Sequence, residues 1–308
     1  MNAKRYPSCI LASCCVPWNE DGTLAESIFR REIRNLLANL TRDVYIFGTA
    51  GEGYAVSDKQ FDQIVRVFRE ETNQPDVRGM VGLISLSLPT MIERMERARE
   101  IGICHFQISL PSWGALTDGE LKIFFQETCG RFPDCSFLHY NLMRTKRLVS
   151  PEEYAILAER HPNLVAAKNS TDDQERIRGL ITKAPQLQHF FTETGFAYGS
   201  ELGECGFLIS MASVHFAEAK RYFAAGRGGD KETLLRGQQE LLGMVTDLVA
   251  LGRSEAHMDG AYDKVFCKIH DPEFPLRLLP PYAGLSEATF QRITAMIRDK
   301  YPRWNNKI

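Results

Sequence analysis

Lys168 stands where an amine can be kept neutral and used as a nucleophile. It follows the apolar run 164–167, which is typical of a buried strand, and it precedes the polar turn 169–173. An ordinary lysine has a pKa near ~10.4, so a fraction of order 10⁻³ is neutral at pH 7, and burial enlarges that fraction. A neutral lysine amine attacks a carbonyl carbon and forms a Schiff base. Because solvated lysines at strand ends are common, this prediction depends on the residues that accompany Lys168.

Two other expected strands also end in polar sequences. The apolar run 44–47 leads into the glycine-rich turn 48–53, and the run 136–140 ends at Tyr140. If these strands belong to one parallel barrel, their carboxyl ends meet at a single mouth. We therefore expect Lys168, Tyr140 and the glycine-rich turn to face one pocket.

This set of residues is suited to chemistry on a 2-oxo acid. Tyr140 can transfer protons while the first adduct loses water, and Thr49 can relay or orient that proton. The backbone N–H groups of Ala50 and Gly51 are suited to holding the carboxylate of the 2-oxo acid. The iminium that forms on Lys168 is an electron sink, which permits a bond to be made or broken at the adjacent carbon.

The elements that would position these residues alternate regularly along the chain. Ser57 and Ser150 give start signals for two of the intervening helices. Strands separated by helices predict an α/β fold, a (β/α)8 TIM barrel with its site at the carboxyl ends of the strands. A doubly wound open sheet is the alternative, but the glycine-rich phosphate loop that it usually carries is absent. The eight expected strands are 10–16, 44–47, 79–84, 105–109, 136–140, 164–167, 189–192 and 206–211.

Beyond the last expected strand the sequence pattern is helical only. Apolar residues at helical spacing predict a long helix over 234–248 and a second over 256–269, and Ser286 caps a third. No linker separates these helices from the barrel. We predict a barrel domain of residues 1–222 and a C-terminal helical region of residues 223–308 packed on it.

The composition argues against several functional classes. The 308 residues include 37 basic and 39 acidic side chains, for a net charge of -2, and no long block of one sign. We therefore expect neither nucleic acid nor a membrane as partner. No apolar stretch approaches the ~20 residues of a membrane-spanning helix, and the N-terminal segment lacks the pattern of a signal peptide. The cysteines form no CxxC pair and the histidines no HExxH motif, so we predict a cytoplasmic protein without metal or cofactor.

Two residues near the expected mouth are predicted to be structural. Glu52 closes the glycine-rich turn, and we expect it to stabilise a helix start or an internal polar contact rather than act as a base. Tyr198 follows the bend at 194–195, where an aromatic side chain is expected to pack against its neighbours.

The motifs together resemble a known family. The Gly-Thr-Ala-Gly-Glu sequence at 48–52, the Tyr140-Asn141 pair and the strand that carries Lys168 are similar to motifs of the dihydrodipicolinate synthase and N-acetylneuraminate lyase family of pyruvate-dependent class I aldolases. The resemblance covers essentially the whole chain, including residues 206–210 and 277–281. Each motif alone is weak, whereas their order and spacing together are specific.

The resemblance implies both a fold and an assignment of roles. The fold is a TIM barrel with a helical C-terminal domain, assembled as a homo-tetramer that is a dimer of dimers. Lys168 is implied to be the Schiff-base lysine, Tyr140 the proton-transferring tyrosine and Thr49 its hydroxyl partner. We also predict that Gly195, after the seventh strand, and Ile209, on the eighth, contact the substrate.

Three departures from the family pattern concern the second substrate. Ala50 replaces the second hydroxyl residue of the turn, although the backbone cradle is retained. Trp113 stands where a relay tyrosine supplied across a subunit interface is expected, and an indole N–H cannot shuttle protons at ordinary pH. Trp113 is predicted either to stack on the substrate or to be a loop residue that closes an interface. The loop after Tyr140 is shorter. Arg144 either aligns with the arginine that receives the second substrate's carboxylate or is a loop arginine in solvent. These departures argue against the synthase activity of lysine biosynthesis.

We therefore predict a cofactor-free lyase that binds pyruvate or a related 2-oxo acid covalently on Lys168. Its expected reaction is aldol condensation or cleavage, with an aldehyde as the second substrate. Two alternatives stay open. One is the dehydration of a 2-keto-3-deoxy sugar acid through the same enamine, and the other is a non-catalytic family member that binds a 2-oxo acid in a regulatory role.

Overall fold

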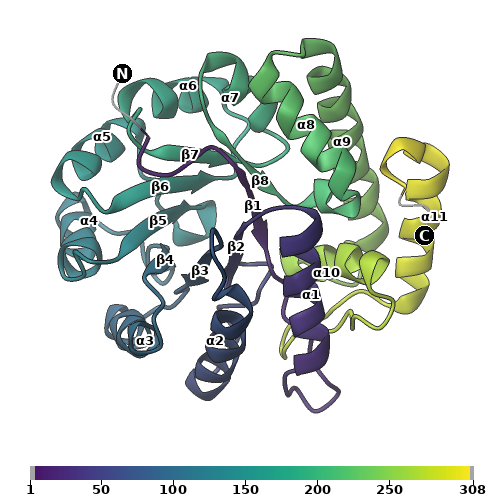
Figure 1. Cartoon of the computed structure of the whole chain (residues 1–308), viewed down its shortest axis with the longest axis horizontal. Helices are drawn as coiled ribbons and strands as arrows, with labels where there is room; N and C mark the ends of the chain where they lie inside the picture. Colours follow the sequence, from purple (N-terminus) through teal and green to yellow (C-terminus); the bar gives the residue numbers. More distant parts are fainter. Residues whose placement is uncertain (1–3, 306–308) are drawn as a thin grey trace.

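A closed barrel of eight parallel strands forms the centre of the molecule (Figure 1). The computed structural model describes residues 4–305, so the start of the segment considered for a signal peptide, residues 1–3, lies outside it. Each strand pairs with the next, and β8 pairs with β1. All eight strands overlap the predicted ranges, which confirms the predicted fold. The strands are β1 (Ile10–Ser13), β2 (Asp43–Ile46), β3 (Arg78–Gly82), β4 (His105–Ile108), β5 (Ser136–Asn141), β6 (Leu164–Asn169), β7 (Gln188–Phe191) and β8 (Gly206–Ile209).

A helix follows every strand. Ser57 and Ser150 each close a capping box, at the starts of α2 and α5. The domain boundary predicted at residue 222 falls inside α8, and the division of the chain stays a prediction. The helices are α1 (Glu26–Asn39), α2 (Asp58–Thr72), α3 (Leu88–Glu100), α4 (Asp118–Phe125), α5 (Pro151–Arg160), α6 (Gln174–Lys183), α7 (Phe196–Leu202), α8 (Phe216–Gly228), α9 (Lys231–Gly252), α10 (Asp259–His270) and α11 (Glu287–Lys300).

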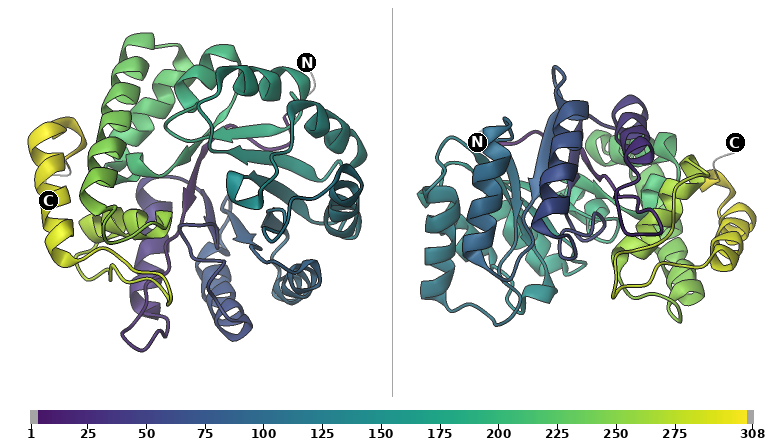
Figure 2. Two further views of the ribbon diagram at one scale, coloured as in Figure 1. Left: turned by 180° about the vertical axis from the view of Figure 1, so that it is seen from behind. Right: turned by 90° about the horizontal axis from the view of Figure 1, so that it is seen from below.

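The C-terminal helices gather on one side of the barrel. Figure 2 shows α9, α10 and α11 as a lobe beside it, with α9 packed along α8. Helix α10 lies next to α1 and the end of β1 in Figure 1. The C-terminal region therefore brings side chains to the mouth at which the strands end.

Two strands each point a side chain near their carboxyl end into this mouth. Leu138 of β5 and Ala166 of β6 lie in the apolar cluster inside the barrel. Side chains two residues further along a strand point the same way, so Tyr140 and Lys168 stand directly above that cluster. The two residues are opposite each other in the β5–β6 register. The strand β6 continues to Asn169, past the predicted end at 167, because its pairing with β5 continues.

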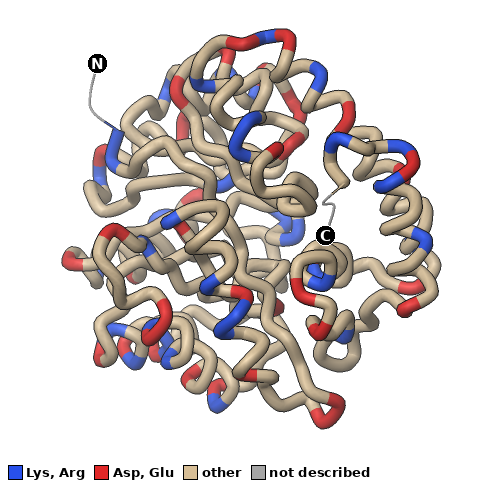
Figure 3. The backbone as a smooth tube through the Cα atoms, turned by 45° about the vertical axis from the view of Figure 1, so that its right-hand side comes forward, with Lys and Arg blue, Asp and Glu red and all other residues tan. Residues whose placement is uncertain are grey.

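The surface carries both signs of charge. Figure 3 shows acidic and basic residues mixed along the outer segments, in keeping with the net charge of -2. Among residues 4–305, no helix is long and apolar enough to cross a membrane.

Candidate active site

A pocket of about 100 Å³ opens at the carboxyl ends of the strands. It receives side chains from both halves of the barrel and from α10. Three of the residues predicted to do chemistry lie in its wall together, namely Lys168, Tyr140 and Thr49. The full lining is Ser13, Tyr45, Thr49, Ala50, Tyr140, Lys168, Ser170, Thr192, Leu208, Ile209, Ser210, Asp259 and Asp263.

Lys168 is buried in the wall of this pocket, with 3% of its surface exposed. Its Nζ donates a hydrogen bond to Tyr45 Oη at 2.8 Å and lies 3.8 Å from the centre of the Tyr140 ring. Burial lowers the pKa of Lys168 to about 7, and the carboxylates of Asp263 and Asp259 oppose that shift. The amine is therefore neutral in on the order of half the molecules at neutral pH.

Tyr140 places a second phenol beside Lys168, in addition to that of Tyr45. Its Oη lies 3.4 Å from Thr49 Oγ1, and either hydroxyl can be the donor. Burial raises the pKa of Tyr140, and the hydrogen bond with Thr49 acts in the opposite direction. The phenol therefore keeps its proton at neutral pH.

The glycine-rich turn reaches the pocket through Thr49 and Ala50, whereas the predicted contact Gly51 is absent from its lining. Phe47 and Glu52 both have positive φ angles, 59° and 56°, which fold the turn tightly over the end of β2. A Cβ on Gly51 would lie 2.7 Å from the backbone nitrogen of Phe47, so this close approach requires glycine. Within residues 4–305, the N–H groups of Ala50 and Gly51 donate to no other residue. They are available to a carboxylate.

Glu52 ties this turn to the C-terminal region. Its carboxylate accepts hydrogen bonds from Trp18 Nε1 (2.8 Å), Lys264 Nζ (2.6 Å) and the backbone N–H of Leu279 (2.7 Å). The side chains of Glu52 and Lys264 are both fully buried. The prediction that Glu52 makes an internal polar contact is confirmed.

Replacing Glu52 with glutamine is expected to lower the free energy of unfolding by about 3–5 kcal/mol, because it leaves the Lys264 ammonium buried without a counter-charge. Urea unfolding of the purified variant measures this loss. As a control, Glu152→Gln removes the exposed partner of Lys183, and the expected loss is below about 1 kcal/mol. Equal small losses in the two variants would contradict a structural role for the buried pair.

Two predicted substrate contacts lie at the rim or outside the pocket. The guanidinium of Arg144 donates to both carboxylate oxygens of Asp259, at 3.0 and 3.1 Å. Trp113 is 82% exposed and does not line the pocket of its own chain. Its backbone oxygen accepts a hydrogen bond from Lys146 Nζ at 2.7 Å. In the single chain, therefore, neither residue faces Lys168 directly.

Of the predicted substrate contacts Ile209 and Gly195, only Ile209 lies in the pocket. Ile209 lines the pocket, whereas Gly195 is absent from its wall. A Cβ on Gly195 would lie 2.5 Å from the carbonyl oxygen of Thr171. Close packing of α7 against the β6–α6 loop therefore explains this glycine without a substrate contact. Tyr198 packs partly buried against the core, as predicted.

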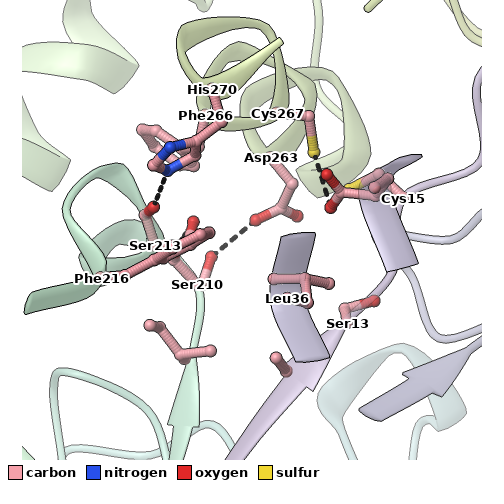
Figure 4. Close-up of a pocket in the computed structure, with 13 residues that line it drawn as sticks. Ser13, Cys15, Leu36, Ser210, Ser213, Phe216, Asp263, Phe266, Cys267 and His270 are labelled. Atoms are coloured by element: carbon pink, nitrogen blue, oxygen red, sulfur yellow. Dashed lines mark hydrogen bonds between the residues drawn. The ribbon is translucent and has the colours of Figure 1, made fainter. Parts of the chain in front are cut away.

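Sequence reasoning missed several residues of the pocket, among them Tyr45, Asp259 and Asp263. Tyr45 faces inward from β2. Because it lies in the apolar run 44–47, the sequence pattern indicates a core residue. The two aspartates come from α10, and Figure 4 shows Asp263 pointing from that helix toward Ser210 at the end of β8. The spacing of Asp259 and Asp263, one turn apart on a helix, is a signal that could have grouped them.

The comparisons with known proteins agree with this geometry. The model of the dihydrodipicolinate synthetase family matches residues 7–297. The chain belongs to this family. The prediction of an enzyme, a lyase of the class I aldolase type, is confirmed at the level of the family.

Individual family members show how far the similarity extends. A 4-hydroxy-tetrahydrodipicolinate synthase of Xanthomonas campestris pv. campestris is 26% identical over 282 residues, which is 90% of this chain and 85% of that protein. The structure of YagE, a prophage protein of the family from E. coli K12 solved in complex with pyruvate, has a TM-score of 0.83 and 17% identity. It covers 94% of this chain and 97% of its own.

A third similar structure is a monomeric dihydrodipicolinate synthase variant. It has a TM-score of 0.84 and 17% identity, with coverage of 96% of this chain and 97% of that one. At these identities the two structures show the shared fold. The activity of this particular family member has to be argued from its own pocket.

Proposed function

We propose that the protein binds pyruvate or a related 2-oxo acid as a Schiff base on Lys168 and catalyses aldol condensation or cleavage. The observation that carries this proposal is the state of Lys168. Its amine is buried at the end of a barrel strand, has a pKa lowered to about 7, and lies 3.8 Å from the centre of the Tyr140 ring. Such an amine is a nucleophile at neutral pH.

The proposed steps use residues of this pocket. The N–H groups of Ala50 and Gly51 hold the carboxylate of the 2-oxo acid, and the neutral amine of Lys168 attacks its ketone carbon. The ketone oxygen takes up the proton that the attacking nitrogen gives up, which leaves a neutral carbinolamine. Tyr140 then protonates the carbinolamine hydroxyl, which leaves as water while the C=N bond forms.

The second half of the reaction uses the same groups. The Tyr140 phenolate left by the loss of water takes a proton from the carbon next to the iminium, which gives an enamine. That carbon then attacks the carbonyl carbon of an aldehyde. The new alkoxide takes a proton from Tyr140. The Tyr140 hydroxyl is hydrogen-bonded to Thr49. Water then hydrolyses the iminium and releases the product and the amine of Lys168.

Exchange of pyruvate's methyl protons in deuterated water tests the proposal. An enzyme that forms the enamine exchanges these protons rapidly, and NMR follows the loss of the methyl signal. A regulatory protein that binds pyruvate without exchange would contradict catalysis. Supplying 2-keto-3-deoxy sugar acids in the same assay separates the dehydratase from the aldolase, because the dehydratase loses water from them and the aldolase releases an aldehyde.

The exchange rate is expected to rise about tenfold between pH 6 and pH 8 and then to level off. The reason is that the ammonium form of Lys168 cannot attack, so the rate is lost as the pH falls through the lowered pKa of about 7. Exchange followed at constant ionic strength measures this profile. A rate that keeps rising beyond pH 9 would mean that Lys168 has the pKa of an ordinary lysine.

Assembly and location complete the proposal. We infer a homo-tetramer, which is supported by the exposure of Trp113 (82%) and Met143 (73%), two large apolar side chains that both neighbour Lys146. A cytoplasmic location is supported by the cysteines, because all eight are free thiols in the structure.

A further inference from the structure

Asp263 brings a carboxylate into the pocket of Lys168. Its Oδ1 accepts a hydrogen bond from Ser210 Oγ at 2.8 Å, and within residues 4–305 its Oδ2 accepts none. Figure 4 shows this carboxylate between α10 and the end of β8. Burial raises the pKa of Asp263 to about 7. Near neutral pH the carboxyl group therefore both donates and accepts hydrogen bonds, which matches the hydrogen-bonding capacity of a hydroxyl group.

The rest of the polar lining consists of hydroxyl groups. Apart from Lys168 and the two aspartates, every polar side chain in the wall is a serine, a threonine or a tyrosine. Such a lining supplies donors and acceptors to an uncharged polar molecule without adding charge. These residues are Ser13, Tyr45, Thr49, Tyr140, Ser170, Thr192 and Ser210.

The charges in the wall disfavour a second anion. Asp259 and Asp263 both line the pocket, and a bound 2-oxo acid adds a third carboxylate. Arg144, which lies outside the pocket lining, already donates two hydrogen bonds to Asp259. That ion pair is half-exposed. Repulsion from Asp259 and the pairing of Asp259 with Arg144 therefore both disfavour an incoming carboxylate.

We infer that Asp263 and Ser210 form a subsite for a hydroxyl group of the second substrate, and that this substrate is an uncharged hydroxyaldehyde and not a carboxylated one. The inference rests on the proposed function and deepens it. Asp263 and Ser210 bind the hydroxyl, while Asp259 occupies Arg144 and so withholds the cation that a carboxylate would need.

A set of four-carbon aldehydes with pyruvate tests this substrate class. The aldoses erythrose and threose carry hydroxyls, butanal carries none, and succinic semialdehyde carries a carboxylate. The expected result is a kcat/KM for the better aldose at least about tenfold above those of butanal and succinic semialdehyde. Consumption of pyruvate measures each rate in the full-length protein. A kcat/KM for succinic semialdehyde equal to or above that of both aldoses would overturn the inference.

Variants then assign the preference to residues. In Asp263→Leu and in Ser210→Ala, the preference for the aldose over butanal is expected to fall about tenfold, because a hydrogen bond to the hydroxyl is lost. An unchanged preference in the folded variants overturns the subsite, and Ser210→Ala decides if Asp263→Leu does not fold. Asp271→Asn is the matched control, since Asp271 lies just beyond α10 and outside the pocket.

Asp259→Ala tests the role assigned to Arg144. The change is expected to raise kcat/KM for succinic semialdehyde about tenfold relative to the aldose, because it removes a repelling carboxylate and frees Arg144; Arg144→Ala in the same chain should reduce that gain. A gain that is unchanged by the loss of Arg144 overturns the role assigned to Arg144.

Reduction with borohydride in the presence of pyruvate distinguishes a failure of the proposed function from a failure of the hydroxyl subsite. If no adduct forms, the proposed function fails. If the adduct forms but neither aldose reacts, the imine chemistry stands and the hydroxyl subsite is overturned.

Discussion

Lys168→Met is expected to lower kcat/KM for the proposed reaction by on the order of 10⁴- to 10⁶-fold. Methionine has nearly the same length and fits the buried position, but it has no amine to attack the 2-oxo acid. The covalent route is then lost as a whole, and only binding and orientation remain. Steady-state assays with the best aldehyde measure the loss, and circular dichroism confirms that the barrel has folded.

The matched control is Lys183→Met at the end of α6. Lys183 is exposed, and its only ion-pair partner among residues 4–305 is Glu152. Its loss is therefore expected to leave kcat/KM within about twofold. A residual activity of Lys168→Met within about a hundredfold of the unchanged protein would contradict the covalent role, because no other amine lines the pocket among the described residues.

Tyr140→Phe is expected to lower kcat/KM by on the order of 10²- to 10⁴-fold, because the phenol that delivers and removes protons is lost. The ring remains, so the packing around Lys168 is unchanged. Tyr45→Phe makes a sharp comparison. Tyr45 also touches Lys168, through a hydrogen bond of 2.8 Å from Nζ, but it lies outside the Tyr140–Thr49 pair.

We expect the loss for Tyr45→Phe to stay within about tenfold, since its hydroxyl orients the amine without entering the proton transfers. Steady-state kcat/KM and the exchange of pyruvate's methyl protons measure both variants. A larger loss for Tyr45→Phe than for Tyr140→Phe would move the proton-transfer role from Tyr140 to Tyr45.

The positions of Lys168 and Tyr140 could be predicted from sequence for a physical reason. A parallel barrel collects the carboxyl ends of its strands at one mouth, so a polar residue at the end of an apolar run is placed by the fold itself. Each of these two residues follows such a run. Tyr140 lies opposite Lys168 in the β5–β6 pair. That these two strands are neighbours follows from the order of the strands alone.

Residues supplied by the C-terminal helices could not be placed in this way. The position of Asp263 depends on how α10 packs against the barrel, and helical periodicity says which face of a helix is apolar but not what it meets. The same limit applies to the buried partner of Glu52, since Lys264 lies 212 positions further along the chain. Long-range packing decided both contacts.

The ion pair with Asp259 changes the role that can be assigned to Arg144. Its place in the loop after Tyr140 agreed with a carboxylate-binding role, but the structure pairs it with Asp259. For Ala50, in contrast, the structure does not change the interpretation made from the sequence. The loss of a hydroxyl at this position left the backbone donors of the turn in place, as the glycine pattern around it predicted.

Covalent trapping tests the central claim most directly. The protein is incubated with pyruvate and sodium borohydride, digested, and mapped by mass spectrometry. Hydride adds to the ketone-derived carbon of the iminium and leaves a stable secondary amine. The proposed function predicts one reduced pyruvate adduct, located on Lys168 and absent in Lys168→Met. An adduct on another lysine, or none at all, would contradict it.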